Sequence, residues 1–357
     1  MTEATLTARA DRLVDLLAED ELDCLLVTNL VNVRYLTGFT GSNGACIVSP
    51  EARLFVTDFR YIEQAEAQVR GFDPVKGERD LLADLAGRLS GRAGFDDADV
   101  SVRTHRKLLE AVGTGVELAA AGGLVERLRE VKDEQELWAI AAATDLADEV
   151  YELIRRRGMV GRSERDVAGE LEGELRARGA EPAFPVIVAS GPQGALPHAV
   201  PRDVEIEPGV LTIVDMGALL DGYCSDCTRT FTTGRLDARA SEVYELVRLA
   251  QEAALGAVSA GANCSEVDAV ARDLIEAGGE GERFGHGLGH GVGLEVHEGP
   301  RLAKTAEGEL RAGNVVTVEP GVYLPGELGV RIEDLVVVTD DGSEVLTSFP
   351  KELIVVD

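Results

Sequence analysis

The sequence has few basic residues and no long apolar run, and both absences narrow its range of partners. Its 357 residues contain 35 Lys and Arg against 64 Asp and Glu, which gives a formal net charge of −29. A negative field of this size repels phosphate backbones and anionic lipids, so neither nucleic acid nor a membrane is an expected partner. No apolar run approaches the roughly 18 residues of a transmembrane helix. The first residues form an acidic amphipathic pattern rather than a signal peptide, and we expect a cytoplasmic protein.

Cysteine is also scarce, and the pattern of the cysteines argues against a disulfide framework. Five cysteines, an odd number, in a long chain without a secretion signal predict reduced thiols. Cys224 and Cys227 form a C-x-x-C sequence, which could belong to a zinc site or a redox site. No second C-x-x-C completes a four-cysteine zinc site, and no helix opens at this one. We therefore expect Cys224 and Cys227 to be buried strand residues.

Residues 1–130 alternate helical and strand-like patterns, which is typical of a small α/β domain. Amphipathic periodicity predicts helices at 5–23, 61–69 and 81–89. Apolar runs predict strands at 24–29, 52–58 and 100–105, and the stretch 32–50 is expected to pass through a Gly/Ser turn into another strand.

A long helix-forming stretch at residues 123–157 marks a change in organisation. Asp133 is a candidate N-cap, and Glu136 stands at the capping-box offset from it. A further helix is expected from Ser163, with Gly179 at its C-terminal end. Beyond it strands dominate, interrupted by two more helical patterns. We place a domain boundary near residue 130, which gives domains 1–130 and 131–357.

Four acidic residues adjoin apolar, strand-like runs in the second domain. Asp215 ends the run LTIV, and Asp226 follows across a Gly/Asp turn, so the two can face one another across a hairpin. Glu319 ends the run VVTV, and Glu333 lies between apolar residues on both sides. A carboxylate in such a position is costly unless it is paired or coordinates a cation.

Two kinds of partner could hold these carboxylates. Hard carboxylate oxygens with one imidazole suit Mn²⁺, Co²⁺, Fe²⁺ or Zn²⁺ in a two-metal site. The alternative is a set of buried ion pairs with Arg229 and Arg331. Several acids presented from separate apolar runs favour the metal site.

The glycine-rich segment 284–300 holds three of the five histidines, His286, His290 and His297. The spacing of the first two resembles the H-x-x-x-H of a zinc helix, which also needs a Glu after the first His. Five glycines between residues 285 and 293 make a helix unfavourable. We expect an extended segment that brings one imidazole to a metal and others towards substrate.

Taken together, these motifs resemble a known family. GHGLGHGVGLEVHEGP, DMGALLDGYCSDCTRTF, EPGVY and GVRIED resemble the metallopeptidases of the methionine aminopeptidase, prolidase and aminopeptidase P family. The stretches YLTGFTGSNG and VTDFRYIEQA resemble the creatinase/prolidase N-terminal domain. The resemblance covers nearly the whole chain. It implies an α+β fold with a pita-bread catalytic domain at 131–357, preceded by a smaller α/β domain at 1–130.

The resemblance implies two divalent metal ions per subunit, with Mn²⁺ the first expectation and Co²⁺, Zn²⁺ or Fe²⁺ the alternatives. Asp215 is the implied ligand of the first metal, and Asp226 and Glu333 would bridge both. His290 and Glu319 would complete the second. The implied nucleophile is a metal-bridging hydroxide, and Glu319 would carry its proton to the leaving nitrogen.

The same resemblance implies which residues meet the substrate. His198 and His297 match the family's two non-ligand histidines, which contact the substrate carbonyl and stabilise the oxyanion. Tyr323 and Arg331 align with substrate-pocket residues of prolyl peptidases. His286 aligns with a position that has no usual ligand role, and we expect a hydrogen-bonded structural histidine.

Several activities occur within the family, and the sequence narrows them. A creatinase-type N-terminal domain argues against a methionine aminopeptidase, and a full ligand set argues against creatinase and the histone-chaperone relatives. A dinuclear Xaa-Pro peptidase acting on a small peptide remains, either a dipeptidase or an aminopeptidase. The alternative is a hydrolase or lyase on the same fold that acts on a small nitrogen- or sulfur-containing metabolite. A homodimer is expected, because this N-terminal domain commonly reaches a neighbour's active site in relatives.

Overall fold

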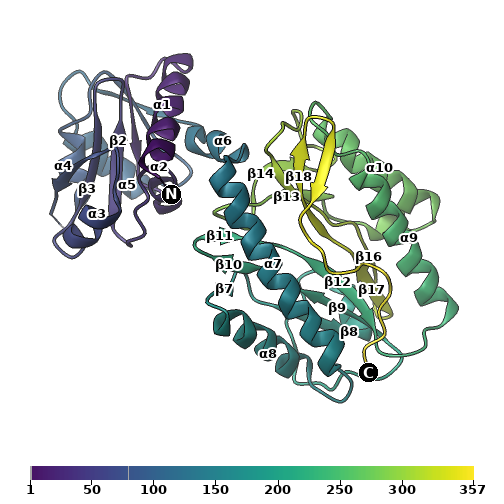
Figure 1. The fold of residues 1–357 in the computed structure, drawn as a ribbon. Helices are drawn as coiled ribbons and strands as arrows, with labels where there is room; N and C mark the ends of the chain where they lie inside the picture. The colour runs from purple at the N-terminus through teal and green to yellow at the C-terminus, as the bar shows by residue number, and fades with distance from the viewer. Residues whose placement is uncertain (1, 79) are drawn as a thin grey trace. The chain divides into compact units, whose positions relative to one another are not determined.

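The computed structural model describes residues 2–78 and 80–357. The chain divides into two compact units, Met1–Arg129 and Glu130–Asp357 (Figure 1). All five cysteines are free and buried. Among the described residues, no helix has both the length and the apolar character needed to cross a membrane.

The first unit is built on one six-stranded sheet. Its strands are β1 (Cys24–Val27), β2 (Gly44–Val48), β3 (Arg53–Thr57), β4 (Asp73–Lys76), β5 (Arg92–Phe95) and β6 (Glu117–Ala120). Its helices are α1 (Glu3–Glu19), α2 (Leu30–Thr37), α3 (Ile62–Gln68), α4 (Leu81–Ala86), α5 (Val102–Ala111) and α6 (Leu124–Glu130). The strand order is β4-β3-β2-β1-β5-β6, and only β2 runs against its neighbours. Every residue of β1 and β2 is buried, so both faces of the sheet are covered.

The second unit contains four long helices and thirteen strands among the described residues. The helices are α7 (Glu134–Arg157), α8 (Glu164–Ala177), α9 (Ala238–Leu255) and α10 (Cys264–Ala277), with short 3₁₀ turns at Gly191–Ala195 and Gly281–Arg283. The first strands are β7 (Glu181–Pro182), β8 (Ile187–Ser190), β9 (Leu211–Asp215), β10 (Ala218–Leu220), β11 (Tyr223–Cys224) and β12 (Thr228–Thr232). The later strands are β13 (Gly289–Gly291), β14 (Glu298–Leu302), β15 (Val315–Val318), β16 (Gly321–Leu324), β17 (Leu328–Arg331), β18 (Asp334–Thr339) and β19 (Gly342–Val345).

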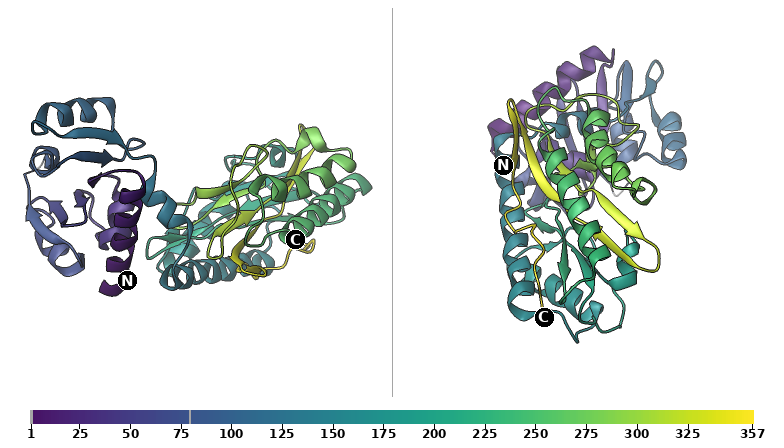
Figure 2. Two further views of the ribbon diagram at one scale, coloured as in Figure 1. Left: turned by 90° about the horizontal axis from the view of Figure 1, so that it is seen from above. Right: turned by 90° about the vertical axis from the view of Figure 1, so that its right-hand side faces the viewer.

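Each half of this unit pairs two helices with antiparallel strands. In the first half α7 packs on α8, and the sheet β12-β9-β8 lies with them around one apolar cluster. The buried Tyr151 hydroxyl of α7 donates to the Cys227 carbonyl at 2.6 Å, which ties the helix to the segment before β12. In the second half α9 and α10 pack side by side (Figures 1 and 2) and cover the sheet β14-β13-β15-β18-β19.

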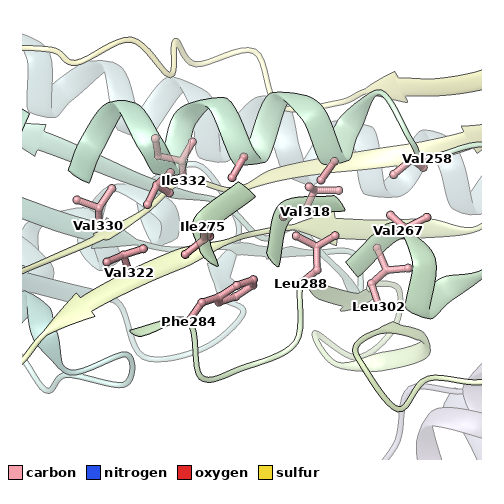
Figure 3. Close-up of a cluster of buried hydrophobic side chains, with 14 of the residues drawn as sticks. Val258, Val267, Ile275, Phe284, Leu288, Leu302, Val318, Val322, Val330 and Ile332 are labelled. Atoms are coloured by element: carbon pink, nitrogen blue, oxygen red, sulfur yellow. The ribbon is translucent and has the colours of Figure 1, made fainter. Parts of the chain in front are cut away.

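A second apolar cluster lies between α9, α10 and the five-stranded sheet, and it anchors the segments that carry Glu319, Glu333 and His290. Figure 3 shows Leu288, Val318 and Ile332 within this cluster. Each is fully buried and lies one or two positions before His290, Glu319 or Glu333 in the chain. Burial of these apolar side chains therefore anchors the backbone next to each polar one.

Most of the predicted elements are present, and the strand predicted at 100–105 is wrong. That stretch opens α5, because the Ser101 side chain caps the helix by accepting the Thr104 N–H at 3.1 Å. A few β-branched residues resembled a strand, and the capping hydroxyl outweighs that preference. The segment 32–50 also begins in the helix α2, which the sequence pattern did not indicate. The Asp133–Glu136 capping box is confirmed at the start of α7, as is the Ser163 cap of α8.

Candidate metal centre

Three of the acidic residues converge because the strands beside them end at the same place, and Asp226 joins them from the segment between β11 and β12. Asp215 is the last residue of β9, and β12 places Thr228 directly opposite it. The Thr228 carbonyl accepts the N–H of Glu333 at 3.1 Å. Val318 of β15 pairs with Asp334 of β18, so Glu319 and Glu333 leave neighbouring strands together. The sheet β12-β9-β8 and the sheet β14-β13-β15-β18-β19 therefore meet at these carboxylates.

His290 completes the group from the glycine-rich segment, which is extended as expected. Its Nδ1 lies 3.1 Å from the Gly291 carbonyl, and the neutral tautomer that donates there leaves the Nε2 lone pair free for a metal. Nε2 lies 3.3 Å from Oε1 of Glu319 and 3.7 Å from Oδ2 of Asp226. Ligand atoms of Asp226, His290 and Glu333 all lie within 4.8 Å of one another, a separation that a metal ion can span.

Two glycines allow the strand that carries His290 to lie so close to its neighbours. A Cβ at position 289 would stand 1.9 Å from the Thr317 carbonyl oxygen of β15. A Cβ at position 291 would stand 2.0 Å from the Gly299 carbonyl oxygen. Any side chain at either position would push the imidazole away from the carboxylates.

The carboxylates have strongly perturbed acidity. Burial, and then the charges of neighbouring carboxylates, raise the pKa of Asp226 and of Glu333 well above the usual range. Burial also raises the pKa of Asp215, although Arg331 partly offsets the rise. Burial alone would lower the pKa of His290, but the hydrogen bond and charge of Glu319 outweigh it and raise that pKa to about 9. Ionisation of all four carboxylates together is therefore costly unless a cation neutralises them.

One buried oxygen supports this conclusion. Among the described residues, Oδ1 of Asp215 has no hydrogen-bond partner, although it is shielded from solvent. A buried carboxylate oxygen without a partner is costly, and coordination would offset that cost. Four carboxylates and one imidazole are a donor set that fits divalent cations.

Arg331 and Tyr323 lie beside this group. Nη2 of Arg331 donates to Asp215 Oδ2 at 2.7 Å, and Nη1 donates to the Tyr323 hydroxyl at 3.0 Å. Part of the ion-pairing alternative therefore occurs, but Arg229 pairs with Asp334 and with none of the expected ligands. Since Arg331 pairs with one oxygen of one carboxylate, arginine ion pairs do not account for the other three carboxylates.

His286, His198 and His297 belong to no group of candidate metal ligands among the described residues. Nε2 of His286 lies 2.9 Å from the Tyr323 hydroxyl, and Nδ1 lies 2.8 Å from the Gly287 carbonyl, so its ring is hydrogen-bonded on both sides. His198 and His297 are exposed to solvent. The His297 ring lies 4.3 Å from that of His290, and its pKa is lowered by burial and by the charge of His290.

Two threonines that the sequence did not single out also organise the site. Thr228 Oγ1 accepts from Arg331 Nε at 3.0 Å and donates to Glu333 Oε2 at 2.8 Å. Thr317 Oγ1 accepts the His290 N–H at 3.1 Å. Threonine is common in strands, so neither residue stands out in the sequence, and only the contacts of the folded chain identify them.

The chain is similar to known proteins over nearly its whole length. Residues 139–340 match metallopeptidase family M24, and residues 9–131 match the creatinase/prolidase N-terminal domain. The Bacillus subtilis peptidase YqhT is 40% identical over 352 residues, covering 97% of this chain and 99% of the relative. An Xaa-Pro dipeptidase from Bacillus anthracis has a TM-score of 0.95 at 39% identity, covering 98% of this chain and 100% of that one. An X-Pro aminopeptidase from Thermotoga maritima MSB8 has a TM-score of 0.89 at 35% identity, with the same coverage.

Proposed function

The chain belongs to metallopeptidase family M24, and from this membership we propose that it is a metal-dependent Xaa-Pro peptidase. It would hydrolyse the bond before proline in dipeptides or at the N-terminus of longer peptides. The observation that carries the proposal is the cluster of the buried Asp226 and Glu333 with the half-buried His290, whose ligand atoms lie within 4.8 Å of one another. The similar Xaa-Pro dipeptidase and X-Pro aminopeptidase structures support the choice of substrate class.

We assign the catalytic site to a pita-bread domain at residues 131–357 and the creatinase/prolidase type to residues 1–130. Two divalent ions, with Mn²⁺ expected, would be held by five residues. Asp215 would bind the first, Asp226 and Glu333 both, and His290 and Glu319 the second. Bound divalent ions supply Lewis acidity and bring the pKa of a coordinated water towards neutrality.

Residues of the chain itself would move the proton and orient the substrate. Glu319, whose Oε1 lies 3.3 Å from Nε2 of His290, would accept the proton of the nucleophilic water. Glu319 would then deliver that proton to the leaving nitrogen. The exposed rings of His198 and His297 would contact the scissile carbonyl and stabilise the oxyanion. Tyr323 and Arg331 would line the substrate pocket.

The compartment and the assembly belong to the same proposal. Five free, buried thiols support a reducing compartment, and we propose the cytoplasm. We also propose a homodimer, which rests on the resemblance of the N-terminal domain to domains that reach a neighbour's active site. Sedimentation equilibrium would measure the assembly directly, and a monomer at micromolar concentration would contradict the homodimer.

An activity panel tests the function. Metal-free protein is reconstituted with Mn²⁺, Co²⁺ or Zn²⁺ and offered Ala-Pro, Ala-Pro-Ala and Ala-Ala. Release of alanine from Ala-Pro alone assigns a dipeptidase, and release from Ala-Pro-Ala as well assigns an aminopeptidase. No hydrolysis of either prolyl peptide by protein that holds its metal would reject the peptidase and favour the alternative of a non-peptide metabolite.

Matched variants connect the activity to the metal centre. Asp226→Asn removes a charge from the cluster and should lower both metal content and activity, the latter by more than the about 10–100-fold typical of a residue that only supports a ligand. Asp273→Asn removes the same charge from an exposed position on α10 and should change neither. Full activity in Asp226→Asn would contradict its role as a shared ligand.

A further inference from the structure

Glu164 bonds the two residues that flank the loop 191–201, which carries His198. It is the first residue of α8, and its side chain is fully buried. Its carboxylate accepts from the Ser190 backbone N–H at 2.9 Å and from the Ser190 hydroxyl at 2.7 Å. It also accepts from the backbone N–H of Arg202 at 3.0 Å, from Nε at 2.9 Å and from Nη2 at 2.7 Å. One carboxylate thus joins the residues on either side of the loop 191–201.

Glu164 can hold both ends of the loop because its carboxylate is charged and because it lies at the start of α8. Burial would raise the pKa of Glu164, but its bonds to Arg202 and Ser190 outweigh burial and lower it, so the group is ionised at neutral pH. Glu164 stands at the start of a helix, where a negative charge is favourable. The backbone N–H of Glu164 donates to the Val204 carbonyl at 3.1 Å, which fixes the end of the helix to the far side of the loop.

Arg331, which also bonds Asp215, contacts the middle of the loop. Arg331 Nη1 donates to the Pro197 carbonyl at 3.1 Å, one residue before His198. The loop also packs closely on β17, since a Cβ at position 329 would stand 1.8 Å from the Gly194 carbonyl oxygen. His198 is exposed, whereas the next residue, Ala199, is buried. The position of the His198 ring is therefore set by the backbone of the loop and not by packing of the ring.

We infer that Glu164 is a positioning residue of the peptidase, which holds the loop 191–201 at both ends so that the His198 ring meets the substrate. The inference rests on the proposed function, because it requires His198 to contact the scissile carbonyl. The carboxylate of Glu164 bonds Ser190 and Arg202, which are not expected metal ligands, so Glu164 acts through the loop. Arg331 fixes the loop at its centre, and Glu164 fixes it where it leaves and re-enters the fold.

The chemistry of the site explains why a glutamate is required there. The guanidinium of Arg202 donates to both oxygens, and Ser190 donates twice to one of them. A glutamine offers one acceptor oxygen, and its amide group would face a donor. Glu164→Gln therefore keeps the size of the side chain but loses the charge-assisted bonds on one side of the loop.

A double-mutant cycle with His198 tests the inference. Glu164→Gln should lower kcat/KM on Ala-Pro by about 10–100-fold, the range expected when a catalytic group is displaced by about 1 Å. In a His198→Ala background, Glu164→Gln should change kcat/KM less than about twofold, because the group it positions is already gone. Metal content should equal that of the wild type. Glu170→Gln is the matched control, since this carboxylate lies on the same helix and pairs with Arg157 and Arg162 instead.

The contrary outcomes are equally specific. An equal loss in the wild-type and the His198→Ala backgrounds would mean that Glu164 acts on folding or metal binding, and it would overturn the inference. If Glu164→Gln does not fold, Arg202→Gln removes the two guanidinium bonds from the partly exposed partner, and the same cycle applies.

Amide hydrogen exchange separates this inference from the proposed function. In Glu164→Gln without substrate, exchange across residues 191–201 should be at least about tenfold faster than in wild type, whereas Glu170→Gln should leave it unchanged. Unchanged exchange would overturn the positioning role even if the wild type hydrolyses no prolyl peptide. Faster exchange without prolyl hydrolysis would reject the proposed function and retain Glu164 as the residue that fixes the loop.

Discussion

Single residues near the candidate metal ligands form hydrogen bonds with two neighbouring side chains at once. Thr228 Oγ1 accepts from Arg331 and donates to Glu333, while its backbone carbonyl accepts from Glu333 as well. Arg331 in turn reaches Asp215 and Tyr323. Such shared partners restrict the orientation of carboxylates before any metal binds, which reduces the ordering that binding must otherwise achieve.

Asp96, in the first unit, gives a pH prediction at the same scale. Its Oδ2 accepts the N–H groups of Thr28 and Asn29, both at 3.1 Å, and burial raises its pKa to about 6 in spite of these bonds. The unfolded value is about 3.9. The folded state binds the Asp96 proton more tightly than the unfolded state does. The protonated carboxyl therefore contributes to the free energy of unfolding, fully below pH about 4, and this stabilisation is lost as the pH rises through about 6.

Replacing Asp96 by Asn should remove that dependence. Between pH 4 and pH 7.5, the free energy of unfolding of Asp96→Asn should gain about 2 kcal/mol relative to wild type. Urea denaturation followed by circular dichroism at both pH values measures the difference. Asp97→Asn, at the exposed neighbouring position, should show no such gain, and an equal gain in both variants would contradict the assignment.

At the scale of elements, the C-terminal segment after β19 is tied to the metal centre through one side chain. The Arg229 guanidinium of β12 donates to the carbonyls of Phe349 and Pro350, and it also bonds the backbone carbonyl of Glu333 and pairs with the buried Asp334. The Arg229 guanidinium therefore links the segment that presents Glu333 to the last residues of the chain, and Lys351 of that last segment also pairs with Asp334.

Arg229→Gln should loosen both segments. The variant leaves Asp334 paired with Lys351 but removes the buried donor of the Phe349 and Pro350 carbonyls, and we expect the free energy of unfolding to fall by about 1–3 kcal/mol. Affinity for Mn²⁺, measured by titration calorimetry, should fall too, because Glu333 is held less firmly. The control Arg239→Gln breaks a half-exposed pair with Glu280 and should cost less than about 1 kcal/mol. Equal losses in the two variants would rule out a special role for Arg229.

At the scale of the whole molecule, the net charge of −29 opposes folding through self-repulsion. Sodium chloride at 0.2 M screens this repulsion, whereas low salt does not. The Tm of metal-free protein at pH 7.5 should rise with salt, by about 2–4 °C for each 1 kcal/mol of repulsion relieved. Near the isoelectric point, about 4.5, the same salt should have little effect. A Tm that falls with salt at pH 7.5 would show that screened ion pairs outweigh the repulsion.

The family resemblance and the fold class expected from the sequence motifs are confirmed, and local signals account for much of this success. The capping box at Asp133 and the cap at Ser163 lie within three residues of the groups they bind, so a short window reveals them. The strand expected at 100–105 failed where two local signals competed and the Ser101 cap prevailed.

The residue pattern alone shows which side chains need an unusual partner. An acid beside an apolar strand and a glycine-rich segment with histidines are costly or strained in isolation, so their type and position pointed to a metal centre before any fold was known. How those partners meet depends on the packed fold. Thr228 joins Arg331 to Glu333, Glu164 joins Ser190 to Arg202, and Arg229 joins β12 to the C-terminal segment. These contacts link residues far apart in the chain, and no local pattern encodes them because their geometry exists only once the sheets and helices have packed.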